Sequence, residues 1–323
     1  MIFLGGTTLN PSDFSVIPEP PAGFKSGFIG IIGRPNVGKS TLMNHLVGQK
    51  IAITSPVAQT TRNRLRGILT TPEAQFIFVD TPGIHKPHHQ LGKVLVKNAI
   101  GAISSVDILL LMVDGSVEAG GGDRFIMEML TQTKTPVILG LNKIDLRSSL
   151  SRPRDVEVID RSYQELAENL KWPVARFSAT TGEGLADLLT LLGDRLEPGP
   201  YYYPPDLVTD RPERFIIGEL IREQILYLTR EEVPHSVAIS LDLMEETKDL
   251  TRILATIYVE RPSQKGIIIG KGGQMLKAIG SAAREQMQKL IEGKVYLEIF
   301  VKVQPNWRQS RIHLAELGYK LED

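Results

Sequence analysis

The sequence predicts a three-layer α/β domain followed by a smaller α+β domain. Between residues 28 and 196, short apolar runs alternate with amphipathic stretches, and the order of elements changes beyond a proline-rich segment. The 323 residues are enough for two domains that each bury a core. Hydrophobic residues make up 42% and charged residues 23%, which is typical of globular proteins and excludes wholesale disorder.

The first 26 residues predict a disordered extension. They contain Pro11, Pro18, Pro20 and Pro21 and no periodic apolar pattern. They also lack the basic region and the long apolar stretch of a signal peptide, and no run in the chain approaches the roughly 20 apolar residues of a membrane helix. We assign this extension no function.

The chain contains no cysteine, which excludes disulfides, thiolate zinc sites and a cysteine nucleophile. This composition fits a reducing compartment, so we expect a cytoplasmic protein. The 37 basic and 37 acidic side chains give a net charge of zero, so the overall charge does not indicate a nucleic-acid partner.

The first domain is predicted to span residues 27–196. Its apolar runs are continuous rather than alternating, which indicates strands covered on both faces and therefore a mainly parallel sheet. These runs are FIGII, QFIFVD, ILLLMVD, PVILGLNK and VARFS. Residues 197–214 are rich in proline and predict a linker.

The second domain is predicted to span residues 215–323 and to be a small α+β unit. The expected elements, in order, are a helix at 214–229, strands at 235–246 and 252–260, a helical region broken by glycines at 262–292, a strand at 294–303 and a last helix.

A phosphate-binding loop follows the first apolar run. The pattern G-x-x-x-x-G-K-S is followed by the helical segment TLMNHLVG, as this motif requires. Backbone N–H groups and the helix N-terminus would hold phosphates, the lysine would reach the β and γ phosphates, and the serine would ligate Mg²⁺. The predicted nucleotide-binding residues here are Gly33, Arg34, Pro35, Asn36, Val37, Gly38, Lys39, Ser40 and Thr41.

The run QFIFV ends in the sequence Asp80, Thr81, Pro82, Gly83, which places these residues at the carboxyl end of a strand. Asp80 is then predicted to be the second Mg²⁺ anchor. Gly83 would bring a backbone N–H to the γ-phosphate. The same four residues could also form an ordinary turn, and only their position after a buried strand favours a site.

The strand PVILGL leads into Asn142, Lys143 and Asp145, which predict guanine selectivity. Guanine presents two adjacent N–H donors that one carboxylate can accept, whereas adenine would leave the charge unpaired. Asn142 and the stem of Lys143 would brace this loop and cover the base. Ser178, Ala179 and Thr180 could place a backbone N–H near guanine O6, or could simply form the N-cap of the next helix.

These four elements, in this order, resemble the translation-factor class of P-loop GTPases, and the segment ITSPVAQTTRNRLRG resembles switch I of the Era-like branch. The resemblance implies a six-stranded sheet, GTP and Mg²⁺ as ligands, and GTP hydrolysis. It also implies that Thr61, with Thr60 as the alternative, senses the γ-phosphate and contacts the metal. The implied metal set is Ser40, Thr61 and Asp80, and the implied catalytic set is Lys39, Thr61, Gly83 and Asn36.

Ile84 stands where related GTPases carry a glutamine that orients the attacking water. An alkyl side chain cannot orient water, so the resemblance implies slow hydrolysis by the free protein. Asn36 matches the position that holds K⁺ in potassium-activated relatives, and K⁺ is the implied accelerator.

Two groups near the switches have alternative interpretations. Arg62, Arg64 and Arg66 could supply charge to the nucleotide or to RNA, but a solvated basic loop is favoured. His85, His88 and His89 could suggest a metal site, yet no carboxylate or cysteine lies at ligand spacing, so surface residues are favoured.

The sequence KGIIIGKGG predicts a nucleic-acid-binding loop in the second domain. Its G-x-x-G precedes a helix, as in KH domains, where the loop holds about four single-stranded nucleotides through the backbone. A helix-to-helix turn is the alternative. The predicted RNA-binding residues are Lys265, Ile267, Gly270, Lys271, Gly272, Gly273 and Lys277.

Segregated charge favours the RNA interpretation. Residues 261–311 contain ten Lys or Arg and three Glu, whereas residues 213–249 contain nine acids and four bases. The order of elements resembles a type II KH domain. Some of Ile267, Ile268 and Ile269 must be core, and Tyr201–Tyr203 could stack on bases or pack the linker.

The combination of this switch I with a KH domain resembles the Era-like family from about residue 27 to the C-terminus. The family implies a monomer that binds the 3′ end of small-subunit (16S) ribosomal RNA and assists rRNA maturation and small-subunit assembly, with peripheral contact to the inner membrane face. The alternative is a GTPase whose KH-like domain docks a protein or membrane-surface partner for signalling or cell-cycle control.

Overall fold

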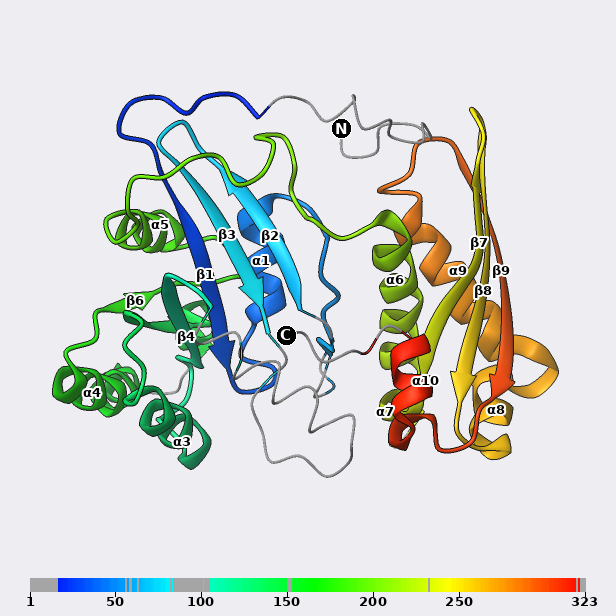
Figure 1. The fold of residues 1–323 in the computed structure, drawn as a ribbon. Coiled ribbons are helices and arrows are strands. Elements are labelled where there is room, and N and C mark those ends of the chain that lie inside the picture. Colours follow the sequence, from blue (N-terminus) through cyan, green and yellow to red (C-terminus); the bar gives the residue numbers. More distant parts are fainter. Residues whose placement is uncertain are drawn as a thin grey trace.

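A computed structural model gives the fold of the chain in two domains (Figure 1). It describes residues 17–55, 57, 60–62, 64–81, 83, 101, 105–149, 153–231, 233–317 and 319. The predicted extension at residues 1–26 therefore lies mostly outside the description. Phe24 is buried at 3% exposure, and the first strand begins at Lys25, two residues before the predicted start of the domain.

The N-terminal domain is built on a six-stranded sheet of order β2-β3-β1-β4-β5-β6. All neighbouring strands are parallel except β2 and β3, which confirms the predicted mainly parallel sheet. The strands are β1 Lys25–Gly33, β2 Leu65–Thr70, β3 Ala74–Asp80, β4 Ile108–Asp114, β5 Val137–Asn142 and β6 Val174–Arg176.

Strand β2 is not among the five apolar runs identified in the sequence. It lies at the edge of the sheet and carries Arg66, so its burial is partial and its apolar pattern is interrupted. Its first residues, 65–67, are the last residues of the switch I segment.

Among the described residues, four helices cover the sheet in pairs. Buried residues of α1 (Lys39–Val47) and α5 (Leu185–Gly193) share one apolar cluster on one face. Those of α3 (Gly121–Leu130) and α4 (Pro153–Leu170) share another cluster on the opposite face. Successive β4 residues alternate between the clusters, with Leu110 in the first and Leu109 and Leu111 in the second.

The linker runs along the β2 edge of the sheet rather than through solvent (Figure 1). The buried amide of Gln75 accepts from the backbone of Tyr202 and Tyr203 and donates to the carbonyl of Tyr203 at 2.9 Å. The rings of Tyr201 and Tyr202 pack against Phe24 and Phe28. These contacts place the tyrosines in linker packing, the second of the two predicted roles.

The C-terminal domain has a three-stranded sheet of order β7-β8-β9, in which β8 pairs antiparallel with β7 and parallel with β9. This arrangement confirms the predicted type II KH order. Its elements are α6 Glu213–Leu228, α7 Val233–Ser236, β7 Ala238–Glu246, β8 Leu250–Val259, α8 Pro262–Ile269, α9 Gln274–Met287, β9 Lys294–Val303 and α10 Arg311–Glu316.

Helices α6 and α9 pack together on the side of this sheet that faces the N-terminal domain (Figure 1). Their apolar side chains form one core with the inner face of the sheet, and Ile53 of the N-terminal domain joins the same cluster. The two domains therefore share an apolar contact. Within the described residues, no helix is both long and apolar enough to cross a bilayer.

Candidate functional site

The phosphate-binding loop lies between the end of β1 at Gly33 and the start of α1 at Lys39. Gly38 has φ 101°, and a Cβ there would lie 2.3 Å from the side-chain nitrogen of Asn142, so only glycine fits. The ammonium of Lys39, 6% exposed, donates to the carbonyls of Gly33 at 3.3 Å and Arg34 at 3.0 Å. Phosphate oxygens can take the place of these carbonyls as acceptors.

Burial lowers the pKa of Lys39 to about 8, although the nearby carboxylate of Asp80 opposes this shift. A buried ammonium with only partial compensation has a strong electrostatic preference for an anion. The loop is therefore suited to a polyphosphate.

Three oxygens converge beside the lysine. The Ser40 hydroxyl donates to Asp80 Oδ2 at 2.8 Å, the Thr61 hydroxyl donates to the same oxygen at 3.1 Å, and the two hydroxyls lie 3.0 Å apart. Burial raises the pKa of Asp80, and Lys39 together with the two hydroxyls opposes this rise.

Asp80 has no exposed surface, and its Oδ1 has no hydrogen-bond partner among the described residues. Hard oxygen donors around a buried, incompletely paired carboxylate fit Mg²⁺. The Thr60 hydroxyl is engaged elsewhere, since it donates to the carbonyl of Val57 at 2.6 Å. The structure thus brings Thr61, rather than Thr60, to the other two predicted metal ligands.

The segment after Asp80 passes close to the phosphate loop. A Cβ on Gly83 would lie 2.8 Å from the backbone nitrogen of Pro35, so glycine allows this close approach. Thr81 is buried and its hydroxyl donates to the carbonyl of Ile31 at 2.8 Å, which holds β3 to β1. The predicted site residue Pro82 lies outside the described residues, as do Ile84, His85, His88 and His89.

Asn142 joins the phosphate loop to the base-binding side. Its amide nitrogen donates to the carbonyl of Val37 at 2.8 Å, and its amide oxygen accepts from the backbone of Ala179 at 2.8 Å. Lys143 has a left-handed backbone, φ 66°, and its ammonium pairs with Asp114 at 2.7 Å. Burial of Asp114 raises its pKa, but hydrogen bonds from Lys143 and Ser116 outweigh it and lower the pKa overall.

Asp145 and Thr180 line the same cavity as the phosphate loop, which places the predicted base-binding residues beside the phosphate site. The cavity has a volume of about 650 Å³. Its lining includes Pro35, Asn36, Gly38, Lys39, Ser40, Thr41, Thr61, Gly83, Lys143, Asp145 and Thr180. This volume is in the range of small-molecule sites.

The Ser178-Ala179-Thr180 loop is organised by its own serine. The Ser178 hydroxyl accepts from the backbone of Thr180 at 3.3 Å and of Thr181 at 3.0 Å, which forms a serine turn, whereas α5 has Gly184 as its N-cap and no side-chain cap. The N–H of Ala179 is directed at Asn142. The alternative prediction, that these residues form the N-cap of the next helix, is wrong, because α5 begins after Gly184, and Thr180 lines the cavity.

Arg34 points away from the phosphates. It pairs with the buried carboxylate of Asp123 on α3 at 2.7 Å, and this hydrogen bond raises the pKa of the guanidinium. A Cβ on Gly122 would lie 2.6 Å from the Arg34 side chain, which explains one of the three consecutive glycines at 120–122. Arg34 is therefore placed to hold the loop from outside.

The second glycine loop connects α8 and α9 and has an open outer side. Gly270, Gly272 and Gly273 all have positive φ, at 72°, 59° and 79°. A Cβ on Gly270 would lie 2.7 Å from that of Met275, whereas Cβ atoms on Gly272 or Gly273 would meet nothing within 4 Å. The loop is a helix-to-helix turn whose outer glycines leave the backbone accessible, as contact with a nucleic-acid backbone requires.

The side chains predicted to bind RNA surround this loop. Lys271 and Lys277 are exposed and Lys265 is half-buried. Ile267 is 48% exposed, whereas Ile268 is fully buried in the core and Ile269 is partly buried. The structure thus separates the three isoleucines that periodicity could not divide.

Several polar residues of the site and its surroundings were not identified from the sequence. Tyr227 of α6 lines the nucleotide cavity, and Glu223 of α6 pairs with Lys50 at 2.6 Å and accepts from the backbone of Thr54 at 2.9 Å. These residues are far from the motifs in sequence, and no local pattern could have indicated them.

The basic residues after Thr61 do not form the solvated loop that was favoured. Arg62 is 2% exposed and its guanidinium lies in the C-terminal domain, Arg64 donates to Ser105 at 2.6 Å, and Arg66 pairs with Asp210 at 2.5 Å. The interpretation of Arg62 as solvated is wrong, because a tertiary contact buries it.

The fold and the two glycine loops define a P-loop GTPase joined to a KH domain. Family models agree: residues 28–143 match the 50S ribosome-binding GTPase family, and residues 232–308 match the KH domain family. The chain belongs to the GTPase Era family. It is 73% identical to GTPase Era of Nostoc sp. PCC 7120, over 95% of this chain and 93% of that protein. It is 69% identical to GTPase Era of Rippkaea orientalis, over 97% and 98% of the two chains.

Solved structures give the same result. The chain is similar to Era in complex with MgGDPNP and nucleotides 1506–1542 of 16S ribosomal RNA, with a TM-score of 0.86, 36% identity and coverage of 92% of this chain and 100% of the other. The same values relate it to an Aquifex aeolicus Era variant bound to GDP and AlF₄⁻.

Proposed function

We propose that this GTPase binds GTP with Mg²⁺ and hydrolyses it, and that its KH domain binds the 3′ end of small-subunit ribosomal RNA during rRNA maturation and small-subunit assembly. The single observation that carries the RNA part is the open outer side of the 270–273 loop, where a Cβ on either Gly272 or Gly273 would meet no atom of the described residues within 4 Å. The similar Era structure that contains a 16S rRNA fragment supports the choice of RNA.

The proposal that the protein binds GTP rests on one cavity, which is lined both by the phosphate loop and by the predicted base-binding residues. Lys39 and the loop N–H groups bind the phosphates, Ser40, Thr61 and Asp80 hold Mg²⁺, and Asp145 reads guanine. Mg²⁺ supplies neutralisation of the charge on the β and γ phosphates. Thr61 and Gly83 come from the two switch segments, so they can respond to the γ-phosphate.

Guanine selectivity can be tested with Asp145→Asn. An amide at this position offers a donor where guanine also has donors, but it matches the carbonyl of xanthine. We expect GTP affinity to fall by at least about 100-fold and XTP affinity to rise. An equal loss of affinity for GTP and for XTP would contradict the assigned contact between Asp145 and the base.

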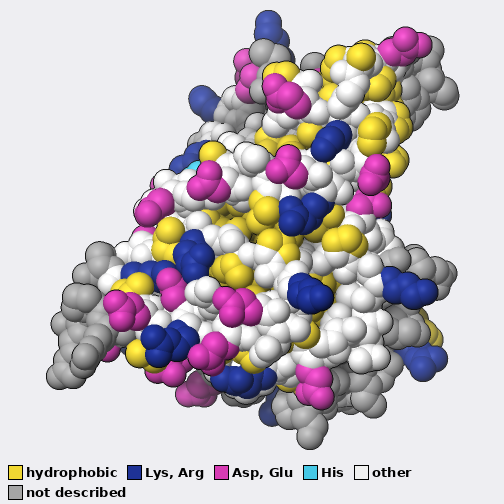
Figure 2. All heavy atoms as spheres, turned by 90° about the vertical axis from the view of Figure 1, so that its left-hand side faces the viewer, with side chains coloured by type: hydrophobic (Ala, Val, Ile, Leu, Met, Phe, Trp, Pro, Cys, Tyr) yellow, Lys and Arg dark blue, Asp and Glu magenta, His cyan; other side chains and the backbone are white. Residues whose placement is uncertain are grey.

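The face of the molecule shown in Figure 2 is not favoured as an RNA-binding surface, because acidic and basic side chains are mixed over its described part. Basic residues are instead concentrated in the sequence of residues 261–311, which includes the exposed Lys271 and Lys277. This distribution favours the KH loop as the RNA contact.

Gly272 offers a matched pair of variants for the RNA test. Its φ of 59° lies in the left-handed region that Asp and Asn tolerate, and a side chain there meets open space. Gly272→Asp adds a negative charge where phosphate would lie, and Gly272→Asn adds the same shape without charge. Gly270 is a poor choice, because a side chain there would clash with Met275.

Filter binding to the 3′-terminal fragment of 16S rRNA is the measurement. We expect Gly272→Asp and Lys271→Glu to lower the affinity at least tenfold, Gly272→Asn to lower it less, and GTP binding to be unchanged in all three. Equal RNA affinity in wild type and Gly272→Asp would refute RNA binding by this loop. Binding of a protein or of anionic vesicles, instead of RNA, would favour the docking alternative.

Cytoplasmic residence is part of the same proposal, because small ribosomal subunits are assembled there. Cell fractionation that places the protein wholly in the membrane pellet, insensitive to salt, would contradict it.

A further inference from the structure

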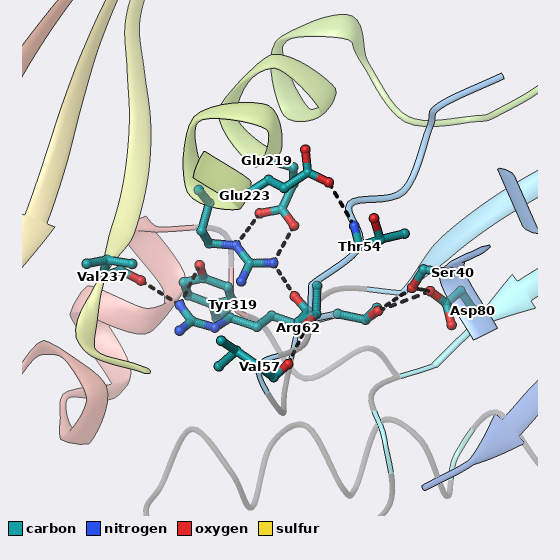
Figure 3. A network of polar contacts seen from close by, with 12 residues as sticks. Ser40, Thr54, Val57, Arg62, Asp80, Glu219, Glu223, Val237 and Tyr319 are labelled. Carbon is teal, nitrogen blue, oxygen red and sulfur yellow. Dashed lines mark hydrogen bonds and ion pairs between the residues drawn. The ribbon is translucent and has the colours of Figure 1, made fainter. Parts of the chain in front are cut away.

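Arg62 crosses from switch I into the KH domain (Figure 3). Its guanidinium donates to the backbone carbonyls of Val237 at 2.6 Å, Pro234 at 3.1 Å and His235 at 3.2 Å. We call these three acceptors the carbonyl cluster. The guanidinium also lies 5.9 Å from the ring centroid of Tyr319.

The Arg62 guanidinium is held by backbone carbonyls and by the Tyr319 hydroxyl at 3.5 Å, while the carboxylate of Glu219 acts on it from farther away. Among the described residues it forms no ion pair, its Nε has no acceptor, and the cation of Arg222 lies nearby. Burial of the guanidinium lowers its pKa, and Arg222 adds to this lowering. A buried cation without a directly paired carboxylate is costly, so this contact depends strongly on the positions of the three carbonyls.

The other end of the contact is the metal site. Thr61 is the residue before Arg62, so their Cα atoms are about 3.8 Å apart and neither can move far without the other. The Thr61 hydroxyl reaches Ser40 and Asp80, while the Arg62 side chain enters the KH domain (Figure 3). The carbonyl of Thr60 also accepts from Arg222 of α6.

The carbonyl cluster is in turn fixed by the segment after β9. Trp307, fully buried, donates from its ring to the carbonyl of Ser236 at 2.9 Å. Arg308 donates to the carbonyl of His235 at 3.5 Å and pairs through Nε with Glu260 at 2.9 Å. One member of the cluster, the carbonyl of His235, is thus in contact with the Arg308–Glu260 ion pair.

Glu260 lies just before α8, and the RNA loop follows the C-terminal end of that helix. The backbone N–H groups of Glu260 and Arg261 both donate to the buried side chain of Gln264 at 3.0 Å, which fixes the start of α8. Helix α8 ends at Ile269, and Gly270 begins the glycine loop. The metal site is thus connected to the loop by the backbone from Thr61 to Arg62, by hydrogen bonds and one ion pair, and by α8.

We infer that Arg62 is a positioning residue: its contact with the carbonyl cluster fixes Thr61 in the metal site and, through Arg308 and Glu260, links the γ-phosphate to the geometry of the 270–273 loop. The inference rests on the proposed function. Because the γ-phosphate site and the RNA loop both depend on this contact, nucleotide binding changes the free energy of RNA binding, and RNA binding changes that of nucleotide binding by the same amount. Loss of Arg62 therefore reduces the effect of each ligand on the affinity for the other.

The first test uses nucleotide alone, so that its outcome is independent of RNA binding. Arg62→Met keeps most of the apolar stem and removes the guanidinium. We expect it to weaken binding of the analogue GDPNP with Mg²⁺ about tenfold and to leave GDP binding within about twofold, since Thr61 responds to the γ-phosphate. Arg66→Met is the matched control, because it removes an ion pair between β2 and the linker that does not involve the carbonyl cluster.

The second test measures RNA affinity with GDP and with GDPNP, using the 3′-terminal 16S rRNA fragment. The ratio of the two affinities reports the coupling. We expect a ratio different from 1 in wild type and in Arg66→Met, and a ratio near 1 in Arg62→Met and in Arg308→Met. Because both residues lie on one route, the double variant should lose no more coupling than either single variant.

If Arg62→Met does not fold, Arg62→Lys serves instead, since one ammonium nitrogen keeps the charge but cannot occupy the positions of both guanidinium nitrogens that donate to the carbonyls. An unchanged GDPNP-to-GDP affinity ratio in a folded Arg62 variant overturns the inference, and so does a wild-type RNA affinity ratio of 1. Absence of RNA binding by wild type, with the nucleotide effect of Arg62 intact, would instead refute the proposed function and leave the role of Arg62 at the metal site standing.

Discussion

The side chain of Asn142 donates to the carbonyl of Val37 across 105 positions of sequence, at 2.8 Å, and both residues are buried. The same side chain accepts from Ala179, so one amide holds the phosphate loop and the base loop together. Its role is to position both loops, and Gly38 must be glycine to let it approach.

We therefore predict that Asn142→Ala lowers the affinity for GTP and GDP alike, by about 10- to 100-fold, because two buried hydrogen bonds are lost. Asn142→Asp keeps the acceptor for Ala179 but turns a carboxylate oxygen toward the Val37 carbonyl, so it should be at least as damaging. Isothermal titration with both nucleotides checks this. Loss of GTP affinity with normal GDP affinity would assign Asn142 to the γ-phosphate instead.

The pKa of Lys39 predicts a proton uptake on nucleotide binding. The pKa is about 8 in the protein without phosphates and is expected to rise when phosphates surround the ammonium. Binding should therefore take up about half a proton at pH 8 and little at pH 6.5. Titration calorimetry in buffers of different ionisation enthalpy measures this number. An uptake that does not change between these pH values would show that Lys39 is already fully charged before binding.

The same shift affects stability in the absence of nucleotide. The pKa of Lys39 is about 8 in the folded protein, below its ordinary value of 10.5. The unfolded chain therefore holds more protons between about pH 8 and 10.5, and this group favours folding increasingly as pH rises through that range.

Asn36 allows a test of potassium activation. We propose that its side chain holds K⁺ and that hydrolysis is faster in KCl than in NaCl. Asn36 has φ 64°, so Asn36→Ala would also strain the backbone, whereas Asn36→Gly removes the amide without strain. We expect Asn36→Gly to abolish the difference between the salts in single-turnover hydrolysis. A difference that survives in Asn36→Gly would place the cation elsewhere.

Glu213, the first residue of α6, predicts a pH-dependent stability. Burial and the neighbouring Glu246 raise its pKa from 4.5 to about 7. The folded state holds this proton more tightly than the unfolded state, so stability falls as pH rises from about 4.5 to 7. Glu213→Gln should flatten the decline of Tm over this range, and Glu246→Gln should reduce it partly. Equal slopes in all three proteins would exclude this carboxyl as the cause.

The sequence predicted the fold class of both domains, and its nucleotide motifs lie together around one cavity. Its motifs are local: a glycine loop between a strand and a helix, or a carboxylate at the end of a buried strand, has the same physical meaning wherever it occurs. The continuous apolar runs fixed the parallel sheet, because only strands covered on both faces carry them. The edge strand β2 was missed because it is only partly buried, and partial burial leaves a weaker pattern of apolar residues.

What the sequence could not decide are contacts between residues far apart in the chain. Thr60 and Thr61 are chemically equal in sequence, and only the fold directs Thr61 to Ser40 and Asp80. Arg62 was expected in solvent, but the KH domain buries it against carbonyl groups, which any sequence can supply and no pattern reveals. Local chemistry determined what this protein binds, and tertiary packing alone determined how its two binding sites are joined.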